Sequence, residues 1–154
     1  MTVPTKFRIE EYFEGRVQAE GIVEDLFGKV RRKFTVTIDG HQDGDEFILD
    51  ERFYFDDGER TTRIWKIRST GPGRYEGRAD DVIGAAEGCV NGAEMIWSYR
   101  LDLPIGKRSW AIKFYDRMFL RPDGVMVNIA DMRKWGIRLG RITIAFRRSA
   151  DAPR

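Results

Sequence analysis

Hydrophobic and polar residues alternate along most of the chain, and this pattern predicts short β-strands joined by tight turns. The stretch from Met95 to Leu101, for example, places large hydrophobic side chains at every second position. Glycine, proline and aspartate separate the alternating stretches roughly every 8 to 15 residues, a spacing typical of sandwiches and barrels. We therefore predict an all-β fold of about ten strands, with one or two helical turns before the first strand.

Four turns test this prediction, because a turn sets the register of its two strands and should bring their hydrophobic faces together. The predicted pairs are Val23 with Phe34 around Gly28-Lys29, Leu49 with Trp65 around Asp56-Asp57-Gly58, Leu101 with Ile112 around Gly106-Lys107, and Leu120 with Met126 around Pro122-Asp123-Gly124. Consecutive hairpins of this kind favour an antiparallel up-and-down β-barrel, since closure removes the two exposed edge strands.

A fifth turn is predicted at Asn91-Gly92, a pair that favours the type I′ hairpin. Its register places small residues opposite large ones: Gly88 opposite Met95, Ala86 opposite Trp97, and Gly84 opposite Tyr99. Two interpretations follow. The small residues make room for aromatic rings inside a narrow barrel, or they border a ligand cavity whose floor is Trp97 and Tyr99.

A charged pair lies among the predicted inward positions. Glu51 falls in a hydrophobic row with Leu49 and Phe53 and faces Arg63 across the Asp-Asp-Gly turn. An unpaired carboxylate would be costly there, so Arg63 is expected to be its ion partner. The pair either fixes the strand register or anchors the carboxylate or polar head of a ligand through Arg63. In both cases we expect Glu51→Ala to cost on the order of 3 kcal/mol of stability.

Asp116 is the second polar residue in an otherwise hydrophobic inward row. The predicted register puts it opposite Trp97, whose indole N–H could donate to it, and diagonally near Asn128. A satisfied hydrogen-bond cluster is one interpretation. If Asp116 instead lacks a partner, its pKa would rise, and it would be the best general-base candidate in the chain.

The remaining polar motifs predict no metal and no cofactor. Adjacent strand residues point to opposite faces, so Asp80-Asp81 is a poor catalytic dyad and is expected to cap the bend before Val82. His41 lies in a predicted polar loop, and Cys89 is expected to be a small packing residue. One histidine and one cysteine supply too few ligands for zinc or histidine-ligated haem.

Composition and charge narrow the function classes. The 154 residues can bury a core, and no linker divides them, so residues 1–154 are predicted to form one domain. The net charge of +2 arises from 27 basic and 25 acidic residues mixed along the chain, which argues against nucleic-acid binding.

The ends of the chain and its location give further expectations. Residues 1–13 are predicted to be a capping segment that includes Phe7, Tyr12 and Phe13, and residues 149–154 a disordered tail. We predict no signal peptide and no transmembrane segment. A cytoplasmic protein is therefore expected, or a periplasmic or membrane-associated one if an export segment has been removed.

Four segments, residues 13–36, 49–67, 79–101 and 128–146, together carry a family resemblance. They include FEGRVQAEG, LDERFYFDDGERTTRIW, VNGAEMIWSYRL and KWGIRLGRITIAF. The combination resembles the bacterial domain of unknown function 3833 family, whose members are often lipoprotein-like, over nearly the whole chain. The resemblance implies a calycin-like, lipocalin-type barrel and no established activity.

This chain departs from the family pattern at two places. The family often has an Asp-Asp-Trp-Met segment where this chain reads YDRMFL, so Asp116 matches but Arg117 replaces the tryptophan. Many relatives carry an N-terminal lipid-attachment cysteine that is absent here, so membrane anchoring does not carry over. The first strand also lacks the G-x-W of true lipocalins, which makes the lipocalin analogy architectural only.

Three functions remain open on these grounds. The leading hypothesis is a barrel that binds an apolar or amphipathic, lipid-like molecule, with Trp97 and Tyr99 as contact surface and Arg63 and Asp116 as polar anchors. A cofactor-free isomerase, cyclase or hydrolase would use Asp116 or Glu51 as base. A filled barrel would act only through its outer surface, as a partner-binding or structural protein. An internal void would favour the first two.

Overall fold

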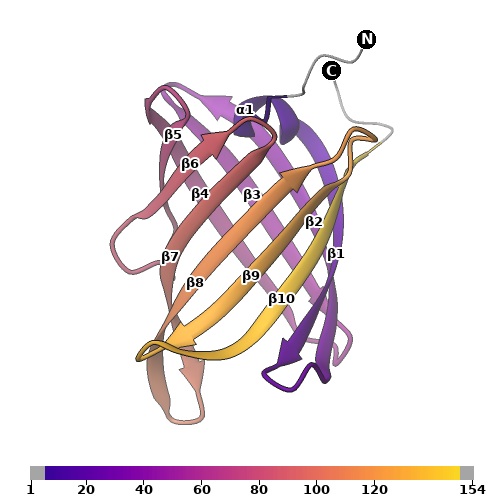
Figure 1. Cartoon of the computed structure of the whole chain (residues 1–154), viewed down its shortest axis with the longest axis vertical. Helices are drawn as coiled ribbons and strands as arrows, with labels where there is room; N and C mark the ends of the chain where they lie inside the picture. The colour runs from indigo at the N-terminus through magenta and orange to yellow at the C-terminus, as the bar shows by residue number, and fades with distance from the viewer. Residues whose placement is uncertain (1–5, 150–154) are drawn as a thin grey trace.

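The computed structural model describes residues 6–149 as a closed barrel of ten antiparallel strands with one short helix (Figure 1). The elements are α1 (Ile9–Tyr12), β1 (Gly15–Asp25), β2 (Val30–Asp43), β3 (Glu46–Phe55), β4 (Arg60–Gly71), β5 (Arg74–Arg78), β6 (Ala86–Asn91), β7 (Glu94–Ile105), β8 (Arg108–Leu120), β9 (Met126–Lys134) and β10 (Ile137–Arg148). Each strand pairs with its neighbours in sequence, and β1 closes against β10. The predicted all-β, up-and-down barrel is confirmed.

Three of the five predicted turns have the predicted register. Leu49 pairs with Trp65, Leu101 with Ile112, and Leu120 with Met126. The two three-residue loops among them, 56–58 and 122–124, end in a glycine with φ of 90° or 87°. Because this left-handed conformation is accessible to glycine without steric cost, the glycine position determines where the loop closes.

The β1–β2 and β6–β7 registers differ from the prediction by two residues. Gly28 is the third residue of a three-residue loop, since the N–H of Asp25 bonds to the carbonyl of Lys29. A β-bulge between Val23 and Glu24 then shifts the register by one residue, so Phe34 faces Gly21 instead of Val23. Gly92 begins the β6–β7 turn, because Asn91 pairs with Glu94, and Gly88 therefore faces Trp97 instead of Met95. A shift of two residues keeps each side chain on its predicted face, so the barrel interior is unchanged.

Residues 6–13 of the N-terminal segment lie across one end of the barrel (Figure 1). Phe7, Tyr12 and Phe13 are buried. The hydroxyl of Tyr12 donates to the backbone carbonyls of Gly124 and Phe146, at 2.8 and 3.0 Å. The β2–β3, β4–β5, β6–β7 and β8–β9 turns lie at this end with α1, and we call it the closed end (Figure 1).

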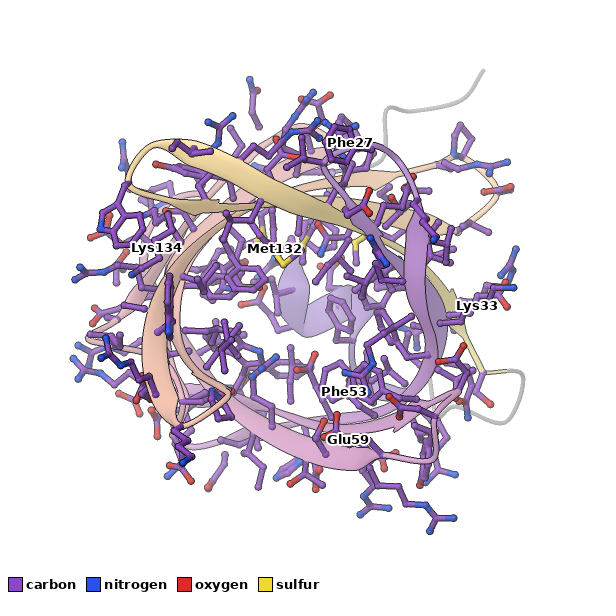
Figure 2. All side chains as sticks on the ribbon, turned by 90° about the horizontal axis from the view of Figure 1, so that it is seen from below. Phe27, Lys33, Phe53, Glu59, Met132 and Lys134 are labelled. Atoms are coloured by element: carbon purple, nitrogen blue, oxygen red, sulfur yellow. The ribbon has the colours of Figure 1, made fainter. Side chains whose placement is uncertain are left out.

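The opposite end is open, and the interior is visible from it as far as α1 (Figure 2). Its rim consists of the β1–β2, β3–β4, β7–β8 and β9–β10 hairpins, and Phe27, Phe53, Glu59, Met132 and Lys134 lie on or near it. Residues 150–154 of the predicted disordered tail, and residues 1–5 of the predicted cap, lie outside the described residues.

Candidate functional site

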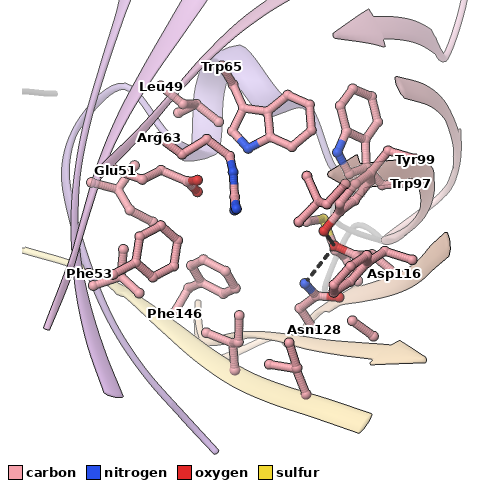
Figure 3. A pocket seen from close by; sticks show the side chains of 18 of the residues that line it. Leu49, Glu51, Phe53, Arg63, Trp65, Trp97, Tyr99, Asp116, Asn128 and Phe146 are labelled. Atoms are coloured by element: carbon pink, nitrogen blue, oxygen red, sulfur yellow. Dashed lines mark hydrogen bonds between the residues drawn. The ribbon is translucent and has the colours of Figure 1, made fainter. Parts of the chain in front are cut away.

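The barrel encloses a cavity of about 310 Å³, which lies at the lower end of the range for small-molecule sites (Figure 3). Hydrophobic side chains line it from the open end, which we call the mouth, to residues 6–13 at the closed end, which we call the plug. Those near the mouth are Val23, Phe53, Phe55, Leu103 and Met132, and those farther in are Trp65, Trp97, Tyr99, Phe114 and Phe146. The interior is therefore not filled by its own side chains, and a small ligand could enter it.

Glycines shape the aromatic wall. The ring of Trp97 lies directly over Gly77 and Gly88, where an added Cβ would come within 2.6 Å of it. The same ring contacts Trp65 edge-on, at a centroid distance of 5.4 Å, and Tyr99 stacks on Phe114 at 5.3 Å. The small residues of this wall therefore make room for Trp97, which is the packing interpretation of the sequence pattern.

Two predicted cavity residues lie elsewhere. Gly84 is exposed in the β5–β6 loop with φ of 71°, so it does not face Tyr99 and the prediction was wrong. The strand that was expected to continue through it begins only at Ala86, because the loop turns there. Ala86 is buried opposite Gly77, but it does not border the cavity. Gly77, which sequence reasoning missed, holds the equivalent place beneath Trp97.

The charged group on the β3–β4 wall contains three residues instead of two. Glu51 and Arg63 face each other across the strands as predicted. However, the guanidinium of Arg63 donates to the carboxylate of Asp81, from Nε at 3.0 Å and from Nη2 at 2.8 Å. Among the described residues, Glu51 forms no ion pair within 4.0 Å. The expectation that Arg63 is the direct ion partner of Glu51 is therefore wrong, and Asp81 is not a simple bend cap.

Burial determines the protonation of this group. It raises the pKa of Glu51 to about 7, although the charge of Arg63 acts in the opposite direction. Glu51 retains some accessible surface because it lines the cavity inside the barrel. Burial lowers the pKa of Arg63, because it disfavours the charged guanidinium. The hydrogen bonds to Asp81 and the charge of nearby Glu51 have the larger effect and raise this pKa.

On the opposite wall, Asp116 is held by two donors (Figure 3). Its Oδ2 accepts from the hydroxyl of Tyr99 and from the amide of Asn128, each at 3.1 Å. Trp97 pairs with Asp116 in the ladder as predicted, but Tyr99 supplies the hydrogen bond expected from the indole. Burial raises the pKa of Asp116 to about 7 against both hydrogen bonds, and raises that of Tyr99 well above its ordinary value.

Two acceptor atoms of this cluster have no hydrogen-bond partner in the described structure. They are Oδ1 of Asp116 and Oδ1 of Asn128, both buried and both on residues that line the cavity. Buried polar atoms are normally paired, so these two are available to a donor group that enters the cavity. Near the mouth, Nε of Arg32 is also buried without a partner, while its guanidinium lies over the Phe55 ring at 3.7 Å.

The site thus combines a hydrophobic approach with polar groups at mid-depth. Within residues 6–149, no group of three or more His, Cys, Asp or Glu side chains could hold a metal ion. His41 is exposed on β2 and Cys89 is exposed on β6, so the predictions of a loop position and a packing position were wrong. Cys89 follows inward-facing Gly88, and alternation therefore turns it outward.

Asp81 and Trp65 are site residues that sequence reasoning missed. Asp81 lies in the β5–β6 loop, outside the strands, so strand alternation gave no signal for it. Trp65 lies in the inward row opposite Leu49, so the face that it occupies was predictable. Its edge contacts with Trp97 and Tyr99 were not, because they cross the interior and no strand register determines them.

Comparisons with known proteins place the chain in a family. In the described residues no helix is long and apolar enough to cross a membrane. No curated protein matches the chain at a significant level. A family model described as protein of unknown function (DUF3833) matches residues 2–148, nearly the whole chain. The chain therefore belongs to the DUF3833 family.

Proposed function

We propose that the barrel binds one small amphipathic molecule, with its apolar part toward the mouth and a hydrogen-bond-donating head at mid-depth. The supporting observation is the pairing of a hydrophobic cavity of about 310 Å³ with two unpartnered acceptors, Oδ1 of Asp116 and Oδ1 of Asn128. A ligand amine has enough N–H donors to satisfy both atoms, whereas a ligand hydroxyl would satisfy one of them. Because the two atoms are already desolvated, a ligand that lacks donors would leave them unpaired.

Charge favours a donor over a carboxylate head. Arg63, the cation expected to grip a ligand carboxylate, already bonds to Asp81 through Nε and Nη2. Above about pH 7 the ionised Glu51 and Asp116 add negative charge to the cavity. An amine head would be attracted by these groups, and a carboxylate head would be repelled.

Matched amphiphiles test the proposal. Decylamine, decanol and decanoate share one chain and differ only in the head, and native mass spectrometry of the full chain with each would report stoichiometry and relative affinity. We expect one bound molecule, with the amine at least about tenfold tighter than the carboxylate at about pH 8. Equal binding of all three would contradict the role of the head, and no binding of any would contradict the function.

A second candidate function has one observation in its favour. Two carboxyl groups with pKa values near 7, Glu51 and Asp116, border the same hydrophobic cavity. Carboxyl groups whose pKa values are raised and that line a cleft often act as general bases. A cofactor-free isomerase or hydrolase is therefore the alternative. A ligand recovered chemically unchanged after prolonged incubation would favour binding; conversion that Asp116→Asn abolishes would favour catalysis.

A further inference from the structure

Exposed hydrophobic side chains gather at the open end of the barrel. Seven of the twelve large exposed hydrophobic residues in the described structure lie in three of its hairpins. We call these seven the rim crescent: Leu26, Phe27 and Val30 in β1–β2, Ile105 in β7–β8, and Trp135, Ile137 and Leu139 in β9–β10. Phe27 is 87% exposed and Trp135 78%. A clustered patch of this kind marks an interaction surface, whereas single exposed hydrophobes do not.

The three hairpins are neighbours around the barrel. The strand order β2, β1, β10, β9, β8, β7 places them consecutively, so the crescent follows one side of the mouth. Figure 2 shows Phe27 and Lys134 on the rim with the open interior between the hairpins. The surface is therefore a row of separate convex tips around a hollow.

Trp135 is exposed and also has an unfavourable backbone conformation. It is the first residue of the two-residue β9–β10 turn and has φ of 52°, the one non-glycine residue with positive φ in residues 6–149. Asparagine, aspartate or glycine is preferred at this position of a type I′ turn, and a bulky aromatic residue is strained there. Since folding alone would favour a smaller residue, the exposed indole points to a function outside the fold.

Two of these hairpins, β7–β8 and β9–β10, are basic, whereas the β1–β2 tip carries Glu24 and Asp25 beside Lys29 and Arg31. Residues 103–110 and 133–139 contain Lys107, Arg108, Arg133, Lys134 and Arg138 and no acidic residue. Lys134 Nζ lies 4.8 Å from the Trp135 ring centroid. By contrast, the β3–β4 tip across the mouth carries Asp56, Asp57 and Glu59. Hydrophobic and cationic side chains thus coincide on one side of the open end.

We propose that the rim crescent docks on the interface of an anionic lipid bilayer. Tryptophan and lysine side by side suit the boundary between acyl chains and headgroups, and neighbouring cations are attracted to anionic lipid. A fluid bilayer can surround separate convex tips, which would leave gaps against a rigid protein face. Docking would also bring the mouth of the cavity close to the acyl chains.

Vesicle flotation of the full chain tests this proposal. We expect binding to mixed phosphatidylcholine and phosphatidylglycerol vesicles at least about tenfold stronger than to phosphatidylcholine alone. Phe27→Ser with Trp135→Asn should lower binding at least about tenfold, whereas Ile64→Thr with Ile96→Thr, exposed on the outer wall, should not. Lys107→Glu with Arg108→Glu should remove the preference for anionic lipid, and the outer-wall control Lys66→Glu with Arg117→Glu should keep it.

Three outcomes would overturn the proposal. They are no binding to either vesicle, wild-type binding by the rim variant, and a dimer in sedimentation velocity that the rim variant converts to monomer. The last would make the crescent an interface between two copies. The inference does not rest on ligand binding in the cavity, so a variant with a filled cavity, Ala130→Leu, should float with vesicles as the wild type does.

Discussion

The two ends of the barrel are built from similar tight hairpins, but their side chains differ. At the closed end the turn tips are small or polar, such as Gly44-Asp45 and Pro72-Gly73, and α1 lies across the opening. There the guanidinium of Arg148 donates to the carbonyls of Glu11 and Tyr12 at 2.8 and 2.6 Å. At the open end the tips present Phe27 and Trp135 to solvent.

This difference means that residues of the closed end contribute to stability, whereas the exposed residues of the open end are free to serve a function. A hydrophobic side chain contributes to folding in proportion to the area that it buries, so the closed end contributes to the core and the exposed open-end tips contribute little. The polar groups of the cavity lie between the ends, where Asp116 is buried and Glu51 is half-buried, so their protonation affects stability. The comparison therefore predicts large effects of substitution at the closed end, pH-dependent effects at mid-depth, and small effects on stability at the rim.

The largest expected effect distinguishes two phenylalanines. Phe13 at the closed end is 3% exposed and Phe27 at the open end is 87% exposed. Phe13→Ala should lower the free energy of unfolding by about 3–4 kcal/mol, because it leaves a cavity beneath the plug. Phe27→Ala should change it by less than about 0.5 kcal/mol. Urea denaturation of both variants measures the difference, and equal losses would contradict the comparison.

The next effect concerns the ion partner of Arg63. Asp81→Asn removes the charged hydrogen-bond partner of the guanidinium and should cost about 2 kcal/mol, a value reduced from that of a fully buried pair because Asp81 is 37% exposed. The matched control is Asp39→Asn, which breaks the outer-wall pair with Arg16 and should cost less than about 0.5 kcal/mol. A cost for Asp81→Asn no greater than that of the control would show that Arg63 does not depend on Asp81.

Asp116 should make stability fall as pH rises. Its folded pKa of about 7 lies above the unfolded value of 3.8, so the folded state retains a proton that the unfolded state has released. The stabilising contribution is complete below pH 3.8 and is lost as pH rises through about 7. Asp116→Asn cannot ionise and should therefore be more stable than wild type at about pH 8, by roughly 2–4 kcal/mol at most.

Urea midpoints measured at acidic and alkaline pH test this expectation. The slope of stability against pH should become shallower in Asp116→Asn, although Glu51, whose pKa is raised in the same direction, keeps part of it. Glu51→Gln should remove that remaining part. An Asp116→Asn slope identical to that of the wild type would show that Asp116 is ionised throughout this range.

The smallest expected effect lies at the rim. Trp135→Asn replaces a strained residue at φ of 52° with one that tolerates positive φ, and should raise the free energy of unfolding by about 0.5–1 kcal/mol. A loss of stability on this substitution would show that the exposed indole contributes to the fold through its contact with Trp110, at a centroid distance of 5.7 Å.

The fold could be predicted from the sequence because alternation and glycine positions act locally. The loops 56–58 and 122–124 contain a glycine whose place in the turn is unambiguous, and their registers were correct. Gly92 fits two two-residue turns whose registers differ by two residues. Around Gly28, a three-residue loop followed by the bulge at Val23 and Glu24 also gives a register two residues from that of the two-residue turn. Since a shift of two residues preserves the alternating faces, the hydrophobic pattern could not distinguish them.

The site could be predicted only in part. The position of Glu51 opposite Arg63 and that of Asp116 opposite Trp97 follow from turns and were correct. The bond from Arg63 to Asp81 depends on the path of the irregular β5–β6 loop, which no strand pairing determines. Tyr99, not Trp97, bonds to Asp116 because the Trp97 ring lies over Gly77 and Gly88, a contact across neighbouring strands.

Calorimetric titration of decylamine at about pH 8 into wild type and Ala130→Leu tests the binding proposal most directly. Ala130 lines the cavity opposite Asp116, so a leucine there should fill space beside the free oxygen without disturbing the rim. We expect the wild type and the outer-wall control Ala145→Leu to bind one molecule, and Ala130→Leu to bind at least about tenfold more weakly. Equal affinity in all three folded proteins would place the ligand outside the cavity and contradict the proposal.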